Sequence, residues 1–486
     1  MNFFQRITSI TGSILLSVCA QTGYTQVGIN ANGATPHPSA MLEVSSNNKG
    51  VLLPRMTTAE RKAIANPAEG LLVFDTDKTT LYIFEGTTWL PLAATSPANL
   101  PPLTRTVSDV AEQDRCGYRV AISDDYAIIG AYTDDIDAKA NQGSAYIFKR
   151  TGGSWIQLAK LTAADGAAHD YFGCSVAISG DWAIVGAYGS DPGNVSAQGS
   201  AYIFHRIDDT WTQHSKITAV DGAANDNFGV SVSIEGDVAV IGAPNDDVGS
   251  ITDEGSAYVF GYLSSSNTWV QQDKITSPDG ASGDAFGYSV AQWNTFIAVG
   301  ASSADVSGQV NRGSVYAYER MGFDWIFREK IIASDGASAD GFGSSIAMST
   351  DYIVVGASGH DTGGKSNQGS AYVYARSGAT WTQRAILTAA DGEANDYFGY
   401  YVATAGNYAV VGSFGDDIGL FTDQGSCYLF KAAGPIWNPV RKIELVNAQT
   451  NDYTGFSVGM SSSWIIIGSP GDTFGYGRIS FLNIEE

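Results

Sequence analysis

The chain has 486 residues, of which 44% are hydrophobic and only 16% are charged, so it has ample material for a buried core. Fifty acidic residues face 27 basic ones, which gives a net charge of −23 and a pI near 4.4. Nucleic acids and anionic membranes attract basic patches, so this balance excludes both as expected partners.

The first 20 residues predict an export signal. Arg6 supplies the positive start, residues 7–18 form a short apolar stretch, and Val18-Cys19-Ala20 offers small residues for cleavage. The apolar stretch is too short to span a bilayer, and no other segment is long and apolar enough to do so. We therefore expect the mature chain to lie outside the cytoplasm.

Residues 21–92 are predicted to form a small β-rich module. Apolar runs at 41–44, 50–57 and 70–74 predict strands, and residues 58–65 predict a helical turn. The segment resembles the leader module of secreted bacterial surface proteins and of phage tail-fibre-like chains, and the resemblance implies no catalytic role. Three prolines mark residues 93–102 as a linker.

A repeat with a period of 56 residues fills the remaining part, residues 103–486. Phe-Gly pairs recur in register, with Cys116-Gly117 and Thr454-Gly455 at the two ends of the series: Phe172-Gly173, Phe228-Gly229, Phe286-Gly287, Phe342-Gly343 and Phe398-Gly399. Tryptophans keep the same register at positions 155, 211, 269, 325, 381 and 437. These positions define seven units, and a period of this size indicates a propeller, a solenoid or an array.

Each unit contains four short β-rich runs separated by turn residues, for example 174–178, 182–187, 200–206 and 211–218. Four-stranded antiparallel sheets repeated in this way are typical of propeller blades. The last unit lacks a fourth run, whereas residues 103–107 lie where a fourth strand occurs in other units. We therefore predict an all-β fold, a seven-bladed β-propeller of four-stranded antiparallel blades closed by an N-terminal strand.

The motif from Phe172 to Phe204 resembles the FG-GAP repeat, and the resemblance covers about four fifths of the chain. It implies the seven-bladed propeller of integrin α subunits and of many secreted bacterial proteins, and hence a place outside a bacterial cell, secreted or at its surface. Integrin-type blades often carry a calcium loop between their first and second strands. Here that link is as short as Ser179-Gly180-Asp181, too short to supply six to eight oxygen ligands, so that calcium site is not expected.

Strand parity places two sets of aspartates on one face of the propeller. The links from strand 2 to strand 3 (2–3 links) and from strand 4 to the next strand 1 (4–1 links) must emerge on the same side. The 4–1 links carry Asp165, Asp170, Asp221, Asp226, Asp279, Asp284, Asp335, Asp340, Asp391 and Asp396, and the 2–3 links carry Asp135, Asp191, Asp247, Asp305, Asp361 and Asp417. Two interpretations stay open. These carboxylates cap turns, which is the commoner role of loop Asp, or they pair across links to bind calcium.

The Phe-Gly and Trp series predict the core between blades, and Cys116 and Cys427 are predicted to be small buried fillers. No catalytic signature occurs: the five histidines lie in unrelated contexts, and neither a Gly-x-Ser-x-Gly elbow nor a phosphate loop is present. We therefore expect no enzyme activity. Residues that break the repeat on the Asp-rich face are candidates for a unique site, or are surface variation: Arg115, His169, Arg312, His360, Lys365 and Glu393.

These features predict a secreted or cell-surface binding or adhesion module. It would recognise an extracellular protein or glycan through the 2–3/4–1 face, with calcium as a candidate cofactor. Two alternatives are a structural, envelope-associated scaffold that self-assembles and an exported polysaccharide-acting enzyme. The oligomeric state stays open.

Overall fold

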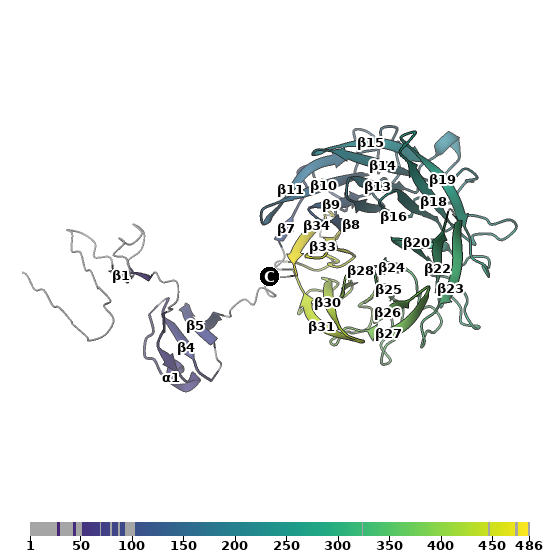
Figure 1. Cartoon of the computed structure of the whole chain (residues 1–486). Helices are drawn as coiled ribbons and strands as arrows, with labels where there is room; N and C mark the ends of the chain where they lie inside the picture. The colour runs from purple at the N-terminus through teal and green to yellow at the C-terminus, as the bar shows by residue number, and fades with distance from the viewer. Residues whose placement is uncertain are drawn as a thin grey trace, which may run out of the picture. The chain divides into compact units, whose positions relative to one another are not determined.

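The computed structural model describes residues 27–29, 42–44, 51–68, 70–77, 80–85, 88–92, 103–322, 324–445, 448–471 and 475–484. The chain divides into two compact units, Met1–Ser96 and Pro97–Glu486 (Figure 1). The predicted export signal (1–20) and linker (93–102) lie outside the described residues. No helix in the described part of the chain is long and apolar enough to cross a membrane.

The first unit contains a four-stranded sheet and one short helix. The sheet order is β3 (Arg55–Met56), β4 (Leu72–Asp75), β5 (Thr80–Glu85) and β6 (Thr88–Leu92), with β3 parallel to β4 and the other pairs antiparallel. Two further strands, β1 (Val27–Ile29) and β2 (Leu42–Val44), form a parallel pair. Strands β5 and β6 were not among the runs predicted from the sequence.

Helix α1 (Thr58–Lys62) is fixed at both ends by side chains. At its start, the Thr57 hydroxyl oxygen accepts the Glu60 N–H while the Glu60 carboxylate accepts the Thr57 N–H, a capping box. Near its end, Arg61 Nε donates to Asp75 at 2.9 Å, and both side chains are buried. The Arg61 guanidinium also lies 3.7 Å from the centre of the Tyr82 ring. Breaking a buried pair leaves a charge without its partner, so this contact fixes the helix on the sheet.

The second unit, called here the repeat domain, contains seven four-stranded antiparallel sheets, numbered 1 to 7 along the chain. Sheet 1 is β8 (Arg119–Ser123), β9 (Tyr126–Ala131), β10 (Ser144–Thr151) and β11 (Ser154–Leu161); sheet 2 is β12 (Ser175–Ser179), β13 (Trp182–Ala187), β14 (Ser200–Ile207) and β15 (Thr210–Ile217). Sheet 3 is β16 (Ser231–Glu235), β17 (Val238–Ala243), β18 (Ser256–Leu263) and β19 (Thr268–Ile275); sheet 4 is β20 (Phe286–Trp293), β21 (Phe296–Ala301), β22 (Ser314–Met321) and β23 (Asp324–Ile331). Sheet 5 is β24 (Ser345–Met348), β25 (Tyr352–Ala357), β26 (Ser370–Ser377) and β27 (Thr380–Leu387); sheet 6 is β28 (Val402–Ala405), β29 (Tyr408–Ser413), β30 (Ser426–Ala433) and β31 (Ile436–Ile443). Sheet 7 is β32 (Ser457–Met460), β33 (Trp464–Ser469), β34 (Arg478–Asn483) and β7 (Leu103–Arg105). The fold is all-β and consistent with a β-propeller.

Sheet 7 joins the two ends of the repeat domain. Strand β7 pairs antiparallel with β34, so that Thr104 lies opposite Ser480 and Leu103 opposite Phe481. The hydroxyl oxygens of Thr104 and Ser480 are 3.1 Å apart. A strand from the start of the repeat domain therefore forms the edge of the sheet made by its end.

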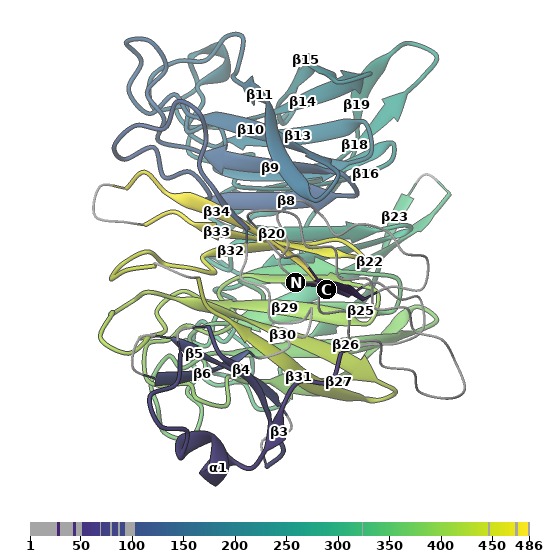
Figure 2. The same ribbon diagram turned by 90° about the vertical axis from the view of Figure 1, so that its left-hand side faces the viewer.

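The first strand of each sheet lies toward a common centre, and the fourth strand lies at the rim (Figure 1). In the side view, the strands run across the thickness of the repeat domain, so the links between them emerge on two opposite faces (Figure 2). In sheets 1 to 6, the strand order follows the chain order. Successive links therefore alternate between the two faces, as the sequence analysis assumed.

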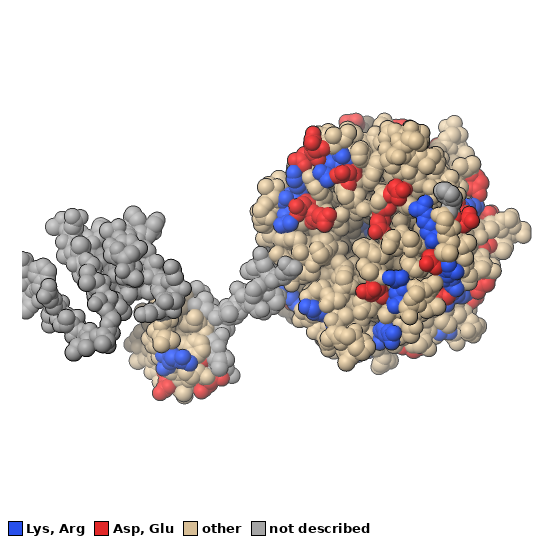
Figure 3. Space-filling model, in the orientation of Figure 1, with Lys and Arg blue, Asp and Glu red and all other residues tan. Residues whose placement is uncertain are grey.

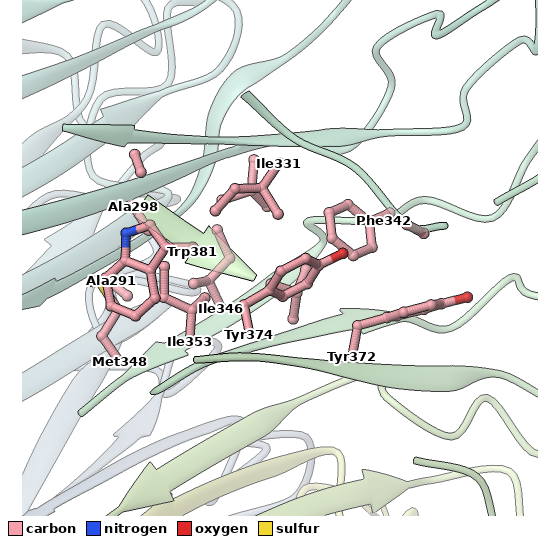
Figure 4. Close-up of a cluster of buried hydrophobic side chains, with 14 of the residues drawn as sticks. Ala291, Ala298, Ile331, Phe342, Ile346, Met348, Ile353, Tyr372, Tyr374 and Trp381 are labelled. Atoms are coloured by element: carbon pink, nitrogen blue, oxygen red, sulfur yellow. The ribbon is translucent and has the colours of Figure 1, made fainter. Parts of the chain in front are cut away.

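Seven clusters of buried side chains fill the spaces between neighbouring sheets. Each cluster takes its residues from two consecutive sheets, and Figure 4 shows the one between sheets 4 and 5, where Phe342 and Trp381 lie. One of the seven joins sheet 7 to sheet 1, where the rings of Trp155 and Phe481 stack with their centroids 4.4 Å apart. The repeat Phe residues are fully buried and the repeat Trp residues almost so, which confirms their predicted core role. Cys116 and Cys427 are buried free thiols, also as predicted.

Facing glycines allow the sheets to approach this closely. A Cβ added to Gly242 on β17 would overlap the carbonyl oxygen of Gly287, the Phe-Gly glycine of the next sheet. The same contact recurs between the pairs Gly130 and Gly173, Gly186 and Gly229, Gly300 and Gly343, Gly356 and Gly399, Gly412 and Gly455, and Gly468 and Gly117. The last of these pairs joins sheet 7 to sheet 1. Each contact is between two backbones, which cannot move aside as a flexible side chain can.

We predict that Gly242→Ala lowers the free energy of unfolding by about 3 kcal/mol, because the added methyl group overpacks a backbone contact. The matched control is Gly153→Ala, since a Cβ there meets nothing within 4 Å and its φ lies outside the left-handed region. The control should change stability by less than about 0.5 kcal/mol. Urea unfolding of both variants tests the prediction, and a Gly242→Ala protein as stable as the parent would contradict it.

Candidate functional site

The 2–3 and 4–1 links are hydrogen-bonded to each other on one face of the repeat domain. The His169 N–H, in a 4–1 link, donates to the Ala140 carbonyl of a 2–3 link at 2.8 Å, and the Phe172 N–H donates to the Gln142 carbonyl at 2.9 Å. The next pair of sheets repeats this pattern, with the Asn225 N–H donating to Ser196 and the Phe228 N–H to Gln198. We call this surface the 2–3/4–1 face. It carries all sixteen candidate aspartates.

Two sets of these aspartates accept backbone N–H groups within their own links. In the 2–3 links of sheets 1 to 6 the carboxylate accepts the N–H six residues later at 2.7–2.9 Å: Asp135, Asp191, Asp247, Asp305, Asp361 and Asp417. In each 4–1 link the second carboxylate accepts the N–H three residues earlier at 2.6–2.9 Å: Asp170, Asp226, Asp284, Asp340 and Asp396. These bonds hold the links in their observed turns.

The third set binds side chains of the neighbouring strands. Asp165 accepts the Tyr202 hydroxyl at 3.0 Å and the Lys216 ammonium at 2.7 Å. The same arrangement recurs at Asp221 with Lys274, Asp279 with Lys330, and Asp391 with Lys442. At Asp335 the lysine position holds Ile386, and His360 Nε2 lies 3.8 Å from the carboxylate instead.

Sequence reasoning missed the lysines and a further set of buried aspartates. Lys274 Nζ bridges Asp221 and the buried Asp246 at 2.6 and 2.7 Å, and Lys160 and Lys442 bridge their own carboxylate pairs in the same way. A lysine recurs in the fourth strand of five units, and this repetition could have identified the partners of the aspartates. Basic side chains also lie beside acidic ones on the face seen in Figure 3. Among the described residues, no group of three or more His, Cys, Asp or Glu side chains is arranged to hold a metal ion.

The pKa values of the carboxylates follow these contacts. Burial alone would raise the pKa of Asp165, but the hydrogen bonds from Lys216 and Tyr202 outweigh it and hold the pKa below its ordinary value. Asp396 has no such partner, so burial raises its pKa to about 6, and the same holds for Asp114. The face therefore contains carboxylates shifted in opposite directions.

Four of the six repeat-breaking candidates take over structural roles. Arg312 replaces a repeat Gln and donates to the Ala333 carbonyl at 2.6 Å, whereas Gln198 and Gln368 bond the corresponding carbonyls. Lys365 bonds the Gly392 carbonyl and pairs with Glu393 at 3.0 Å. His360, as described, faces Asp335. None of these four creates a distinct site.

The other two candidates, Arg115 and His169, lie beside an aromatic surface that the sequence analysis did not identify. Arg115 Nη1 donates to the Tyr132 hydroxyl at 3.2 Å, and the His169 ring centroid is 6.1 Å from that of Tyr171. Nine half-buried rings from sheets 6, 7, 1 and 2, called here the aromatic arc, form one series on the 2–3/4–1 face: Tyr397, Phe414, Tyr400, Tyr453, Phe456, Tyr118, Tyr132, Tyr171 and Tyr188.

The aromatic arc is continuous across the contact between sheets 7 and 1. The Tyr118 ring lies 5.2 Å from Phe456 of sheet 7 and 4.1 Å from Tyr132 of its own sheet, centroid to centroid. At the two ends, Tyr171 stacks on Tyr188 and Tyr397 stacks on Phe414. Sheets 3 to 5 have mostly small or polar residues at the same repeat positions: Val230, Ser344, Pro244, Ser302, Ser358, Asn227, Ala285 and Gly341, with Tyr288 as the aromatic exception.

A cavity of about 140 Å³ lies among the first strands of the sheets, and Tyr118 and Tyr188 of the aromatic arc line it. In five sheets the residue that follows the repeat position of Tyr118 is a serine: Ser175, Ser231, Ser289, Ser345 and Ser457. Four of these hydroxyls donate to the Phe-Gly glycine carbonyl, or its equivalent, of the next sheet at 2.7–2.9 Å. The two exceptions, Arg119 and Tyr401, come from sheets 1 and 6 and meet in the cavity, where the guanidinium carbon is 5.0 Å from the centre of the Tyr401 ring.

The repeat domain has seven four-stranded sheets arranged about a common centre, with an aromatic surface on one face. These features define a β-repeat protein of the propeller-like class. The FG-GAP repeat model matches residues 106–148, 155–204, 211–260, 269–318, 325–374 and 381–430, which together exceed half of the chain. The chain therefore belongs to the FG-GAP repeat family, whose propeller modules are often involved in binding. Residues 28–106 match the phage tail like trimerisation region.

No curated protein matches the chain. Among solved structures, the chain is similar to a putative 6-phosphogluconolactonase from Bacteroides fragilis, with 13% identity, a TM-score of 0.44, and coverage of 76% of this chain and 91% of that one. It is also similar to Sqt1 of Saccharomyces cerevisiae, with 10% identity, a TM-score of 0.41, and coverage of 80% and 100%. Neither similarity bears on function.

Asp396 gives the face a measurable pH dependence. Its folded pKa of about 6 lies above the unfolded value of about 3.9, so the folded state binds this proton more tightly. The resulting stability is fully present below pH 4 and is lost as the pH rises through 6. The lysine-paired carboxylates lose stability only below about pH 4 and leave this window unaffected. We predict that the melting temperature of the parent protein falls more steeply between pH 4.5 and 7 than that of Asp396→Asn; equal slopes in thermal melts would contradict this.

Proposed function

We propose that this protein is a secreted or cell-surface carbohydrate-binding protein whose aromatic arc contacts the sugar rings of a glycan. The observation that carries the proposal is the continuous series of nine half-buried rings on one face. Seven of these rings are tyrosines, which combine an apolar face with a polar tip. A pyranose ring likewise presents an apolar C–H face bordered by hydroxyl groups. Arg115 and His169 lie next to the rings and supply polar groups for those hydroxyls.

The sheets that carry the arc are, in this proposal, blades of a closed seven-bladed propeller. Three contacts support closure: the pairing of β7 with β34, the stacking of Trp155 on Phe481, and the facing glycines Gly468 and Gly117. Closure matters for binding because the arc crosses from sheet 7 to sheet 1. Rings held on a closed frame lose less conformational freedom when a ligand binds, so more of the contact energy appears as affinity.

The amino-terminal unit supports a trimer in which the glycan-binding arcs of three chains act together. The match of residues 28–106 to a trimerisation region supports an assembly of three chains, each presenting one arc. Linked sites bind a multivalent glycan surface far more tightly than one site does. A sedimentation mass near three times that of the 51.2 kDa chain, reduced by the cleaved signal, tests this assembly. A mass equal to one chain would exclude it.

Calcium assistance is a separate hypothesis for the 2–3/4–1 face, and thermal melting tests it. Lysine ammonium groups already lie between carboxylates at Asp221 and Asp246 and at the equivalent pairs. We therefore predict that millimolar calcium leaves the melting temperature within about 1 °C of its value in chelator, whereas a site whose dissociation constant is about a hundredfold below the calcium concentration would add about 2.7 kcal/mol and raise it by several degrees. A rise of several degrees would show that the carboxylates bind the ion.

The proposed function predicts that removing rings at one end of the arc weakens glycan binding. Tyr171→Ala with Tyr188→Ala removes two stacked rings and should lower the affinity for a bound oligosaccharide at least tenfold, about 1.4 kcal/mol. The matched control is Phe327→Ala, which removes a partly exposed ring from β23 at the rim. Glycan-array screening of the whole protein followed by calorimetry on the best ligand provides the measurement. Equal affinities for parent and double variant, or capture of a protein and no glycan, would contradict the proposal.

A further inference from the structure

Arg119 departs from its repeat position in a way that creates a positive charge inside the cavity. Five of the seven sheets place a serine there, and four of those serines bond the next sheet. Arginine cannot make that short contact, and its guanidinium instead lies 4.5 Å from the Tyr118 ring centre, 5.0 Å from Tyr401 and 5.5 Å from Phe456. At these distances the three rings attract the cation through their π faces.

This guanidinium lacks the carboxylate partner that some other arginines of the chain have. Arg150 pairs with Asp125 and Arg206 with Asp181. Arg119 forms no ion pair with an Asp or Glu of the described residues, although acidic residues outnumber basic ones by 50 to 27. Its side chain donates from Nη1 to the Tyr118 carbonyl at 2.9 Å and is also hydrogen-bonded to the Tyr400 hydroxyl. A guanidinium has five N–H donors, so N–H groups remain for a ligand.

The cavity offers a further polar group and enough room for a ligand group. The Ser344 hydroxyl belongs to a cavity-lining residue and has no hydrogen-bond partner among the described residues. The volume of about 140 Å³ far exceeds the roughly 10–15 Å³ that one water molecule needs, so the cavity has room for a group such as a terminal or branching sugar unit.

The net charge of the chain favours a singly charged anion over a highly charged one as the ligand of Arg119. A guanidinium binds a carboxylate through two parallel N–H···O bonds, and it binds phosphate equally well. A net charge of −23 repels highly charged ligands more than singly charged ones. At physiological salt, exposed charges farther than about 8 Å away are largely screened, so a single carboxylate pays little for that repulsion. A sugar carboxylate also fits the adjoining aromatic arc, which is built for sugar rings under the proposed function.

We propose that the cavity binds the carboxylate of a uronic acid at the end or on a branch of a glycan that lies on the aromatic arc, with Arg119 as its ion-pair partner. This inference rests on the proposed function and adds the chemical class of the ligand. Arg119 would select acidic over neutral sugar ends, while the arc would supply contact with the rest of the chain.

Calorimetry on the whole protein with two matched tetrasaccharides tests the proposal, one ending in glucuronic acid and the other in glucose. The parent should prefer the acidic ligand at least tenfold. Arg119→Ser restores the residue of five sheets, so it should fold normally and reduce the preference for the acidic over the neutral ligand to less than twofold. Arg119→Lys should retain part of the preference, because it keeps the charge without the two-pronged geometry. Arg320→Ser is the control, since Arg320 lies over Trp325 at the rim.

Each outcome separates this inference from the proposed function. Equal binding of both tetrasaccharides by the parent, or an unchanged preference in Arg119→Ser, overturns the acidic-sugar site and leaves the glycan-binding function intact. Failure of the parent to bind either tetrasaccharide overturns the inference, and failure on the whole array overturns the function as well. Arg119-dependent binding of a peptide with a free carboxyl terminus, without glycan binding, would reassign the cavity to peptides and overturn both.

Discussion

The close approach of two glycines at every contact between sheets sets the geometry of the repeat domain. At Gly242 and Gly287, as at the other six pairs, backbone meets backbone where any side chain would overlap a carbonyl oxygen. The fully buried Phe residues and the Trp residues then pack beside this contact and fill the space between the sheets. Because a core is packed as densely as an organic crystal, separation at one glycine pair would loosen the whole cluster beside it.

Because the sheets are regularly spaced, residues that depart from the repeat in different units can lie close together. Equivalent residues of successive units recur at equivalent places around the centre, so a departure in one unit lies next to its counterparts in the neighbouring units. Arg119 in sheet 1 and Tyr401 in sheet 6 occupy the position that is serine in the other sheets, and their side chains come into contact across sheet 7. The aromatic arc spans these same sheets together with sheet 2. We thus infer function where the units differ, whereas features shared by most units, such as the lysine-paired aspartates, stabilise the fold.

The sequence predicted the fold far better than the site. A period of 56 residues and four short runs per unit were sufficient to predict the four-stranded sheets, and the Phe-Gly and Trp series identified the core. Strand parity correctly placed the aspartates on one face, but their lysine partners come from strands about fifty residues away, as Lys216 does for Asp165. The aromatic arc escaped notice because its rings occupy three repeat positions, those of Tyr118, Tyr132 and Tyr171, and become neighbours only once the sheets pack. Comparing the units position by position would have revealed Arg119 and Tyr401, since both interrupt a series of serines.

The central claim is that a glycan lies on the aromatic arc of sheets 6, 7, 1 and 2. Hydrogen exchange of the whole protein, with and without a saturating oligosaccharide, tests it most directly, because bound ligand slows the opening of the backbone it covers. The account predicts slower exchange in residues 115–119, 169–174, 397–401 and 453–456, with no change in the hairpin turns of the opposite face such as 179–182 and 235–238. Protection confined to those turns, or to the amino-terminal unit, would contradict it.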